Sequence, residues 1–126
     1  MEKNLNLIVL ISNDVKNKLL KDFGILGIDS VQCYEIMEAS SIIMLNNKRE
    51  FVKDKIIGAP LPGIKACISS SNNKSVGELI LEGDNVMLGY YDDRKATKKV
   101  ITDDILYTGK KVYRDKNGYF YEVVKY

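Results

Sequence analysis

The pattern of apolar and polar positions separates a short mixed α/β part from a longer, strand-rich part. Leu7–Ile11 is a continuous apolar, β-branched run, which predicts a strand covered on both faces. Apolar residues then recur at helical spacing from Val15 to Phe23, and Gly24 predicts the end of that helix. Residues 29–34 predict a second strand. Strand, helix and strand in this order predict a β-α-β unit with parallel strands and a right-handed crossover.

The rest of the chain reads as short strands separated by turns. Two prolines and two glycines predict a rigid loop over residues 58–63, and alternation predicts a strand over residues 64–68 with a polar hairpin tip after it. Residues 105–108 predict a strand that ends at Gly109. Asn117-Gly118, between two runs rich in apolar residues, predicts a β-hairpin.

The stretch from residue 76 to residue 97 is punctuated by three glycines. Residues 78–82 predict a short buried strand, residues 83–85 a turn, and residues 86–88 a return of the chain to the core. Asp92 and Asp93 then predict an N-cap for a short helix over residues 94–100.

Composition and charge exclude several functions. The chain has 126 residues, of which 45% are hydrophobic and 29% charged, as in one soluble globular domain. The net charge of +2 comes from interspersed lysines and acids, which argues against nucleic-acid binding. The apolar run near the start is too short and too polar at its end for a signal peptide or a membrane span. A reducing cytoplasm is the expected location, without a membrane.

The set of reactive side chains is small. The chain contains no histidine, and its two cysteines, Cys33 and Cys67, lie inside apolar runs and form no C-x-x-C pair. This excludes the common zinc sites and the Ser-His-Asp and Cys-His types of catalysis.

Five segments follow one another in a fixed order: residues 58–63 (G-A-P-L-P-G), 76–79 (V-G-E-L), 85–91 (N-V-M-L-G-Y-Y), 107–109 (Y-T-G) and 115–121 (D-K-N-G-Y-F-Y). In this order and spacing they resemble the AMP-forming adenylating family of acyl-CoA synthetases, luciferases and peptide-synthetase adenylation domains. The resemblance implies an α/β fold in which an N-terminal β-α-β unit (residues 1–45) precedes a β-rich, distorted-barrel-like subdomain (residues 55–126). Residues 1–126 would together be a single partial adenylating-enzyme domain.

The resemblance also implies ligand positions. The family's Tyr-Gly-x-Thr-Glu motif, which stacks a ring on adenine and brings a carboxylate to Mg²⁺, reads Tyr34-Glu35-Ile36-Met37-Glu38 here. Tyr34 and Glu38 match, and Glu38 is the candidate metal ligand. Glu35 places a bulky carboxylate where the family has glycine, and Met37 replaces the threonine hydroxyl.

The second ligand motif is changed as well. The family's Thr-Gly-Asp, whose aspartate holds the two ribose hydroxyls, reads Thr108-Gly109-Lys110. Lysine donates hydrogen bonds but cannot accept them, so it cannot take over that role. The Gly-Arg pair at the family's hinge reads Val124-Lys125. The nucleotide-binding candidates are therefore Tyr34, Glu38, Thr108 and Lys110, with ATP or AMP and Mg²⁺ as the ligands that the family implies.

Scaffold positions match the family, whereas Glu35, Met37, Lys110 and Val124 do not. The expected phosphate-binding loop before residue 1 and the domain with the catalytic lysine after residue 126 are not in this sequence. We therefore expect a catalytically inactive fragment of an AMP-forming ligase, with no catalytic residue of its own, that serves as a structural or interaction module. A homo-oligomer or a partner chain is expected to cover its truncated edges.

Two other hypotheses stay open. The chain can be one piece of a split or excised ligase that activates a carboxylate with ATP when other segments complete it. It can also bind AMP or ATP simply, through Tyr34 and Glu38.

Overall fold

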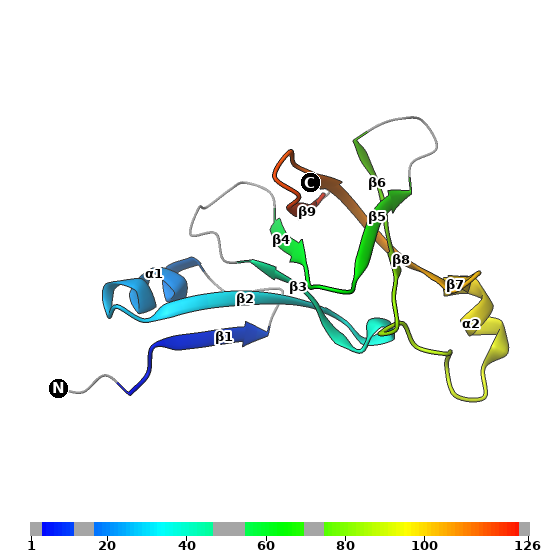
Figure 1. Cartoon of the computed structure of the whole chain (residues 1–126), viewed down its shortest axis with the longest axis horizontal. Helices are drawn as coiled ribbons and strands as arrows, with labels where there is room; N and C mark the ends of the chain where they lie inside the picture. Colours follow the sequence, from blue (N-terminus) through cyan, green and yellow to red (C-terminus); the bar gives the residue numbers. More distant parts are fainter. Residues whose placement is uncertain (1–3, 12–16, 47–54, 70–74, 124–126) are drawn as a thin grey trace.

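The computed structural model describes residues 4–11, 17–46, 55–69 and 75–123. It is a mixed α/β fold made mostly of strands, with one sheet that curls into a half-barrel (Figure 1). The elements are, in order, β1 (Leu7–Ile11), α1 (Asn17–Ile25), β2 (Asp29–Ile36), the 3₁₀ turn η1 (Met37–Ala39), β3 (Ser41–Asn46), β4 (Lys55–Pro60), β5 (Lys65–Ser69), β6 (Val76–Glu82), α2 (Arg94–Val100), β7 (Ile101–Thr102), β8 (Ile105–Arg114) and β9 (Phe120–Glu122).

The strands form the order β1-β2-β3-β4-β9-β8-β6-β5, with β7 added beside β8. β1 and β2 are parallel, which confirms the predicted β-α-β unit, and all the other pairs are antiparallel. α1 lies beside the start of β2, and α2 lies at the opposite end of the molecule (Figure 1). β4, β5, β6 and β9 rise above the long β2–β3 pair, and β7 lies beside α2 (Figure 1).

The core combines residues from both parts of the chain. Its fully buried members include Ile43 and Met44 from β3, Leu79 from β6, Leu106 from β8 and Phe120 from β9. Ile64, Ala66 and Ile68 pack against this core, which confirms that they share one face of a strand. Burial of large apolar side chains from six strands is the main force that holds the half-barrel together.

Several local expectations were wrong. α1 ends after Gly24: the Gly27 N–H donates to the Gly24 carbonyl and the Ile28 N–H donates to the Phe23 carbonyl, both at 3.0 Å. With φ +70° at Gly27, this is a Schellman cap, so the later glycine ends the helix. Residues 58–60 belong to β4, and β8 runs through Gly109 without ending there.

Two expectations about burial were also wrong. Leu88 does not enter the core and is fully exposed. β1 is not covered on both faces, because Leu7, Val9 and Ile11 are 50%, 51% and 52% exposed. β1 is the first strand of the sheet, and no described strand pairs with its outer edge. The sequence run alone could not show this, because it records apolar character and not whether a neighbouring layer is present.

The polar hairpin tip expected after the strand of residues 64–68 falls largely outside the described residues. Asn46 and Ser69 are the last residues of β3 and β5. No helix of the described part of the chain has the length and apolar character that a membrane crossing requires.

Candidate functional site

The motif Tyr34 to Glu38 covers the end of β2 and the turn η1. η1 is fastened to the loop that follows β6 by four hydrogen bonds, which we call the clasp: Tyr90 Oη to Glu38 Oε1 (2.6 Å), Met87 N to Glu38 O (2.9 Å), Ser40 Oγ to Asn85 O (2.7 Å) and Asn85 Nδ2 to Ala39 O (3.0 Å). These bonds join residues that lie 45 or more positions apart in the sequence. The clasp therefore couples the β-α-β unit to the strand-rich part.

Glu38 is the charged member of the clasp. The hydrogen bond donated by the Tyr90 hydroxyl stabilises the ionised carboxylate and lowers the pKa of Glu38, and the backbone amide of Glu38 adds to this effect. The same bond raises the pKa of Tyr90, so this hydroxyl keeps its proton as a donor. One carboxylate oxygen of the candidate metal ligand is thus already engaged by the protein.

Tyr34 lies in the interior. Its side chain is 4% exposed, and burial together with the nearby charge of Glu122 raises the pKa of Tyr34 to about 12. Tyr34 pairs with Met44 of β3 and is part of the main core cluster. A ring with so little free surface contributes mainly to packing.

The Thr-Gly turn, our name for the irregular part of β8 at Thr108 and Gly109, is held by β6. Thr108 Oγ1 donates to the Leu79 carbonyl at 2.7 Å, and the Gly109 N–H donates to Glu78 Oε1 at 2.8 Å. The Lys110 N–H in turn donates to Thr108 Oγ1 at 3.2 Å. The turn is therefore positioned by its own hydrogen bonds, without a ligand.

Lys110 points to an acid of the neighbouring strand. Its Nζ lies 4.0 Å from Glu122 Oε1, and Lys55 Nζ lies 3.9 Å from the other oxygen of the same carboxylate. The charge of Glu122 also raises the pKa of Tyr34, so Lys55, Lys110 and Tyr34 all lie near this carboxylate. Lys110 is half-exposed and the distances are long, so each ion pair contributes little to stability.

The structure thus divides the four candidate ligands into separate groups. Tyr34 and Lys110 share Glu122 as a neighbour, Thr108 is bound to Leu79, and Glu38 is bound to Tyr90. Their role as nucleotide ligands stays a prediction. The other changed positions also face other partners or solvent: Glu35 accepts a hydrogen bond from Ser41 Oγ at 3.0 Å, and Met37 is 89% exposed. Val124 and Lys125 lie outside the described residues.

These side chains do not make a complete site for a magnesium–nucleotide complex. Among the described residues, no group of three or more carboxylates or thiols gathers at one point, and Glu38 is therefore not part of such a group. Lys110 places a cation at the position where the resemblance to the family implies an acceptor for ribose hydroxyls. A hard cation prefers several oxygen ligands, and this set supplies one.

Sequence reasoning missed three residues that organise the site. Glu78 was read only as part of a strand, yet its carboxylate accepts from the Gly109 amide. Glu122 and Tyr90 were not singled out, although they are the partners of Lys110 and Glu38. The change of an expected aspartate to Lys110 was a usable signal for Glu122, because a new cation on a strand favours an acid on the adjacent strand.

The fold and the arrangement of its motifs define the class of protein. It is an α/β chain in which the clasp joins the segment from Tyr34 to Glu38 to the loop that contains Gly89, Tyr90 and Tyr91. The Thr-Gly turn lies on the strand-rich half-barrel. This is the arrangement of a segment of adenylating enzymes. The comparisons with known proteins agree with that class. No family model matches the chain.

Individual relatives do match. The chain is 33% identical over 114 residues to a long-chain-fatty-acid–CoA ligase of Bacillus subtilis, covering 86% of this chain and 20% of that protein. It is 32% identical over 108 residues to a 2-succinylbenzoate–CoA ligase of Oceanobacillus iheyensis, covering 83% of this chain and 22% of that protein. The chain belongs to the AMP-forming acyl-CoA ligase family, and it spans about a fifth of the length of these relatives.

Solved structures show the same fold. The unliganded O-succinylbenzoate coenzyme A synthetase of Bacillus subtilis matches all of this chain with a TM-score of 0.83 at 22% identity, over 28% of its own chain. The N-terminal domain of a Mycobacterium tuberculosis protein, FACL13, matches 94% of this chain with a TM-score of 0.81 at 18% identity, over 32% of its own chain. At these identities the likeness concerns the fold alone.

Proposed function

We propose that this chain is a catalytically inactive fragment of an AMP-forming acyl-CoA ligase that serves as a structural or interaction module. Residues 55–126 would be the barrel-like subdomain of that fragment. The observation that carries the proposal is Lys110: it occupies the position of the family's ribose-binding aspartate and lies 4.0 Å from Glu122. A paired ammonium group cannot accept hydrogen bonds from two hydroxyls.

Two further observations support this proposal. Tyr34 is packed in the core, and Met37 presents a thioether to solvent where the family has a hydroxyl. Meanwhile the contacts that build the fold are intact, including the clasp and the Thr-Gly turn. Scaffold contacts that are present beside changed motif positions support a role other than adenylation.

The test is a complementation experiment with the Bacillus subtilis long-chain-fatty-acid–CoA ligase named above. That enzyme is expressed without the segment matched by this chain, and the segment is supplied as a separate polypeptide. The readout is fatty-acid-dependent exchange of pyrophosphate into ATP. The enzyme's own segment is the positive control and must restore exchange.

Under our proposal this chain gives no exchange above background, and the variant E35G/M37T/K110D, which restores the family's residues, gives measurable exchange. Exchange with the unchanged chain would overturn the proposal. It would favour the alternative that the chain is one piece of a split ligase, which activates a carboxylate with ATP when other segments complete it. The retained Glu38 carboxylate, held ionised by Tyr90, is the observation that favours this alternative.

We also propose that a second copy or a partner chain covers β1, in the cytoplasm. The support is the apolar face of Leu7, Val9 and Ile11, together with the unpaired outer edge of the strand. Cys33 and Cys67 are both free thiols, as a reducing compartment would keep them.

A further inference from the structure

A surface hollow lies between the loop before α2 and one face of α2, far from β1. It is lined by Leu88, Gly89, Tyr90, Arg94, Thr97 and Lys98. Its walls are fixed to one another, because the Tyr90 N–H donates to Thr97 Oγ1 at 2.9 Å and Thr97 Oγ1 donates to the Asp93 carbonyl at 2.8 Å. The hollow is therefore present before any ligand arrives.

Gly89 is required for this arrangement. Its φ is +150°, and a Cβ at this position would lie 2.8 Å from both Cγ2 and Oγ1 of Thr97. Only a residue without a side chain lets the loop lie this close to α2. The loop and the helix thus form one rigid wall.

Two cations line the hollow without a partner. Arg94 and Lys98 are four residues apart on α2 and therefore lie on the same face of the helix. Within the described part of the chain, neither side chain forms an ion pair, and no carboxylate lines the hollow. Asp93, the nearest acid in sequence, uses Oδ1 to accept from the Ala96 N–H. The hollow consequently presents two positive charges to an anion from outside.

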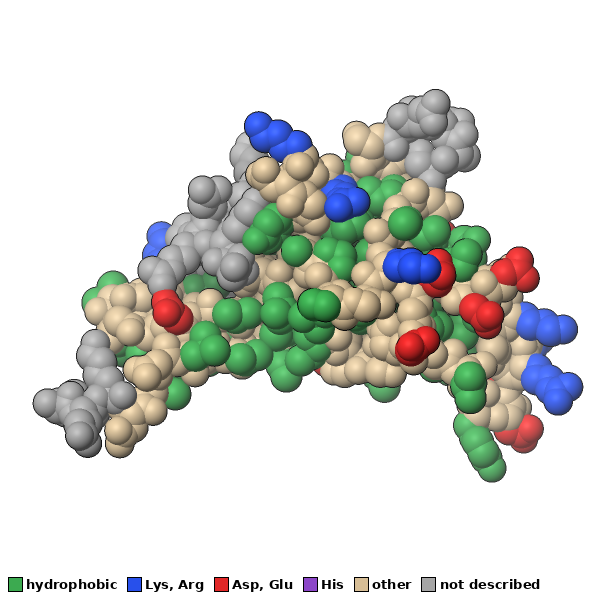
Figure 2. Space-filling view, in the orientation of Figure 1, with side chains coloured by type: hydrophobic (Ala, Val, Ile, Leu, Met, Phe, Trp, Pro, Cys, Tyr) green, Lys and Arg blue, Asp and Glu red, His purple; other side chains and the backbone are tan. Residues whose placement is uncertain are grey.

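Large apolar side chains stand beside these cations. Leu88 and Tyr91 are 103% and 100% exposed, and Met37 is 89% exposed. Met37 and Leu88 are close because their chain neighbours, Glu38 and Met87, are joined by a hydrogen bond of 2.9 Å. Figure 2 shows hydrophobic side chains projecting at the end of the molecule where Lys and Arg side chains lie among Asp and Glu side chains. Single exposed apolar side chains are common, whereas a group of them at one place on the surface marks an interaction site.

We propose that this surface, formed by Met37, Leu88, Tyr91, Arg94 and Lys98, binds a segment of a partner protein in which acidic residues alternate with apolar ones. Leu88 lines the hollow together with Arg94 and Lys98, so one bound segment can contact apolar and basic side chains at the same time. Complementary charge orients the segment, and the apolar contacts supply most of the affinity.

The charge around α2 favours a protein over an anionic membrane. Residues 92–104 contain four basic residues and four aspartates, so the region has no net charge to attract a bilayer from a distance. Arg94 and Lys98 can still pair at short range with individual carboxylates. The partner is therefore a discrete acidic and apolar peptide surface.

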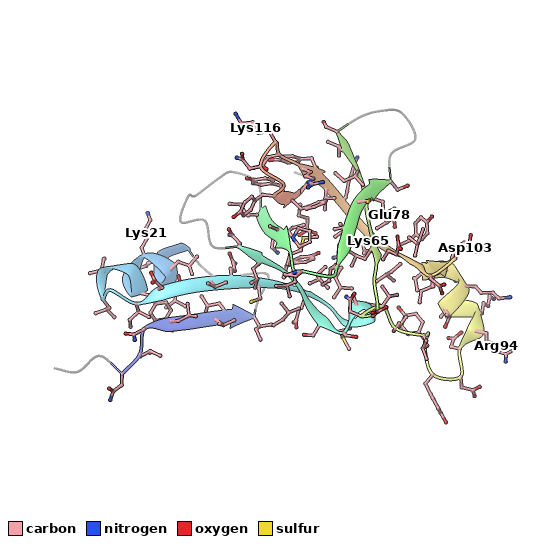
Figure 3. All side chains as sticks on the ribbon, viewed as in Figure 1. Lys21, Lys65, Glu78, Arg94, Asp103 and Lys116 are labelled. Atoms are coloured by element: carbon pink, nitrogen blue, oxygen red, sulfur yellow. The ribbon has the colours of Figure 1, made fainter. Side chains whose placement is uncertain are left out.

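The proposal rests on the interaction role proposed above and names the chemistry of the partner. The probe is a short fluorescein-labelled peptide in which glutamates alternate with leucines and phenylalanines, and binding is measured by fluorescence anisotropy. We expect saturable binding, about tenfold weaker in R94E/K98E, since the loss of two exposed charge pairs has this order of effect. The matched control is K116E, because Lys116 is exposed and lies at the top of the molecule in Figure 3, away from Arg94.

A second variant, L88S, guards against a folding defect in R94E/K98E, because Leu88 is fully exposed and has no packing role to lose. It should weaken binding with an unchanged circular dichroism spectrum. The proposal is overturned if the peptide does not bind, if K116E weakens binding as much as R94E/K98E, or if a peptide with lysine in place of glutamate binds equally well. It is also overturned if phosphatidylserine vesicles bind in place of the peptide.

The two proposals can fail separately. If the chain does not bind the peptide and gives no pyrophosphate exchange, the proposed binding surface is overturned and the proposal of an inactive module is kept. A chain that supports exchange overturns the inactive module, whatever the peptide does.

Discussion

Single glycines decide how closely strands approach in this molecule. Gly58 has φ +116°, and a Cβ there would lie 2.2 Å from the Leu45 carbonyl oxygen on β3. Gly63 also has a positive φ, +88°, but nothing lies within 4 Å of its Cβ position. Replacing Gly63 therefore tests the cost of the backbone conformation alone, and replacing Gly58 tests that cost together with a clash against the backbone of β3.

We expect Gly58→Ala to destabilise the fold by about 3 kcal/mol, because the strained φ and the clash act together. Gly63→Ala should cost about 1 kcal/mol, from the left-handed backbone alone. Urea denaturation of both variants measures the difference. Equal losses in the free energy of unfolding would show that β3 and β4 can move apart at Gly58 at little cost.

The clasp at Glu38 gives a pH dependence with a definite sign. The Tyr90 hydroxyl holds the pKa of Glu38 below the ordinary value of 4.5, so the folded state binds this proton less readily than the unfolded chain. The stabilisation is fully present above pH 4.5 and is lost as the pH falls through the pKa of the folded state.

We therefore expect Tyr90→Phe to be less stable than the unchanged chain at pH 7, and the difference to shrink below pH 4.5. Urea midpoints at pH 7 and at acidic pH measure it. Glu38→Gln serves as the control. Because this variant has no carboxyl group at residue 38, its stability should lack the part of the pH dependence that comes from the titration of Glu38. A difference that stays constant with pH would mean that Tyr90 acts by packing alone.

At the scale of elements, α2 shows how a short helix depends on its cap. It has seven residues, none of them buried, so little tertiary packing supports it. Asp93 Oδ1 accepts from the Ala96 N–H at 2.8 Å, which satisfies one of the amides that the first turn leaves free.

We expect Asp93→Ala to cost about 1 kcal/mol and to speed amide hydrogen exchange in α2, whereas Asp93→Asn, which keeps the capping oxygen, should change little. Exchange in β6 and β8 serves as the internal reference. Faster exchange across all three elements would show that α2 and the sheet open together.

The sequence predicted most elements where local chemistry is decisive. The Asp93 cap, the Asn117-Gly118 hairpin and the strand of Ile64, Ala66 and Ile68 depend on contacts between near neighbours, and the structure confirms them. The prediction from sequence was wrong at the end of α1, where both Gly24 and Gly27 are suitable residues to end the helix. It was also wrong at Gly109, because β8 contains an irregularity there and continues past it. The end of α1 and the continuation of β8 through Gly109 cannot be predicted from the few residues on either side of these glycines.

At the scale of the whole molecule, the unpaired edge of β1 predicts association. Leu7, Val9 and Ile11 form a half-exposed apolar face with no charge on the strand to oppose pairing. Val9→Lys places a cation at the centre of this face. Thr102→Lys, at an exposed position of β7, is the matched control.

We expect light scattering to give a mass above the 14.3 kDa of one chain at high concentration, and Val9→Lys to return it to that mass. Thr102→Lys should leave the assembly unchanged. A single 14.3 kDa species for the unchanged chain at every concentration would contradict association through a second copy.

The amino-acid sequence alone was enough to identify the family, the order of the elements and the departures from the family's motifs at Glu35, Met37 and Lys110, because each depends on which residues occur and in what order. Only the tertiary structure showed that Glu38 is held by Tyr90, that Lys110 lies beside Glu122, and that β1 and Leu88 are exposed. These facts depend on strands and loops that are distant in the sequence and are brought together by burial of the common core. No local pattern records which of them meet.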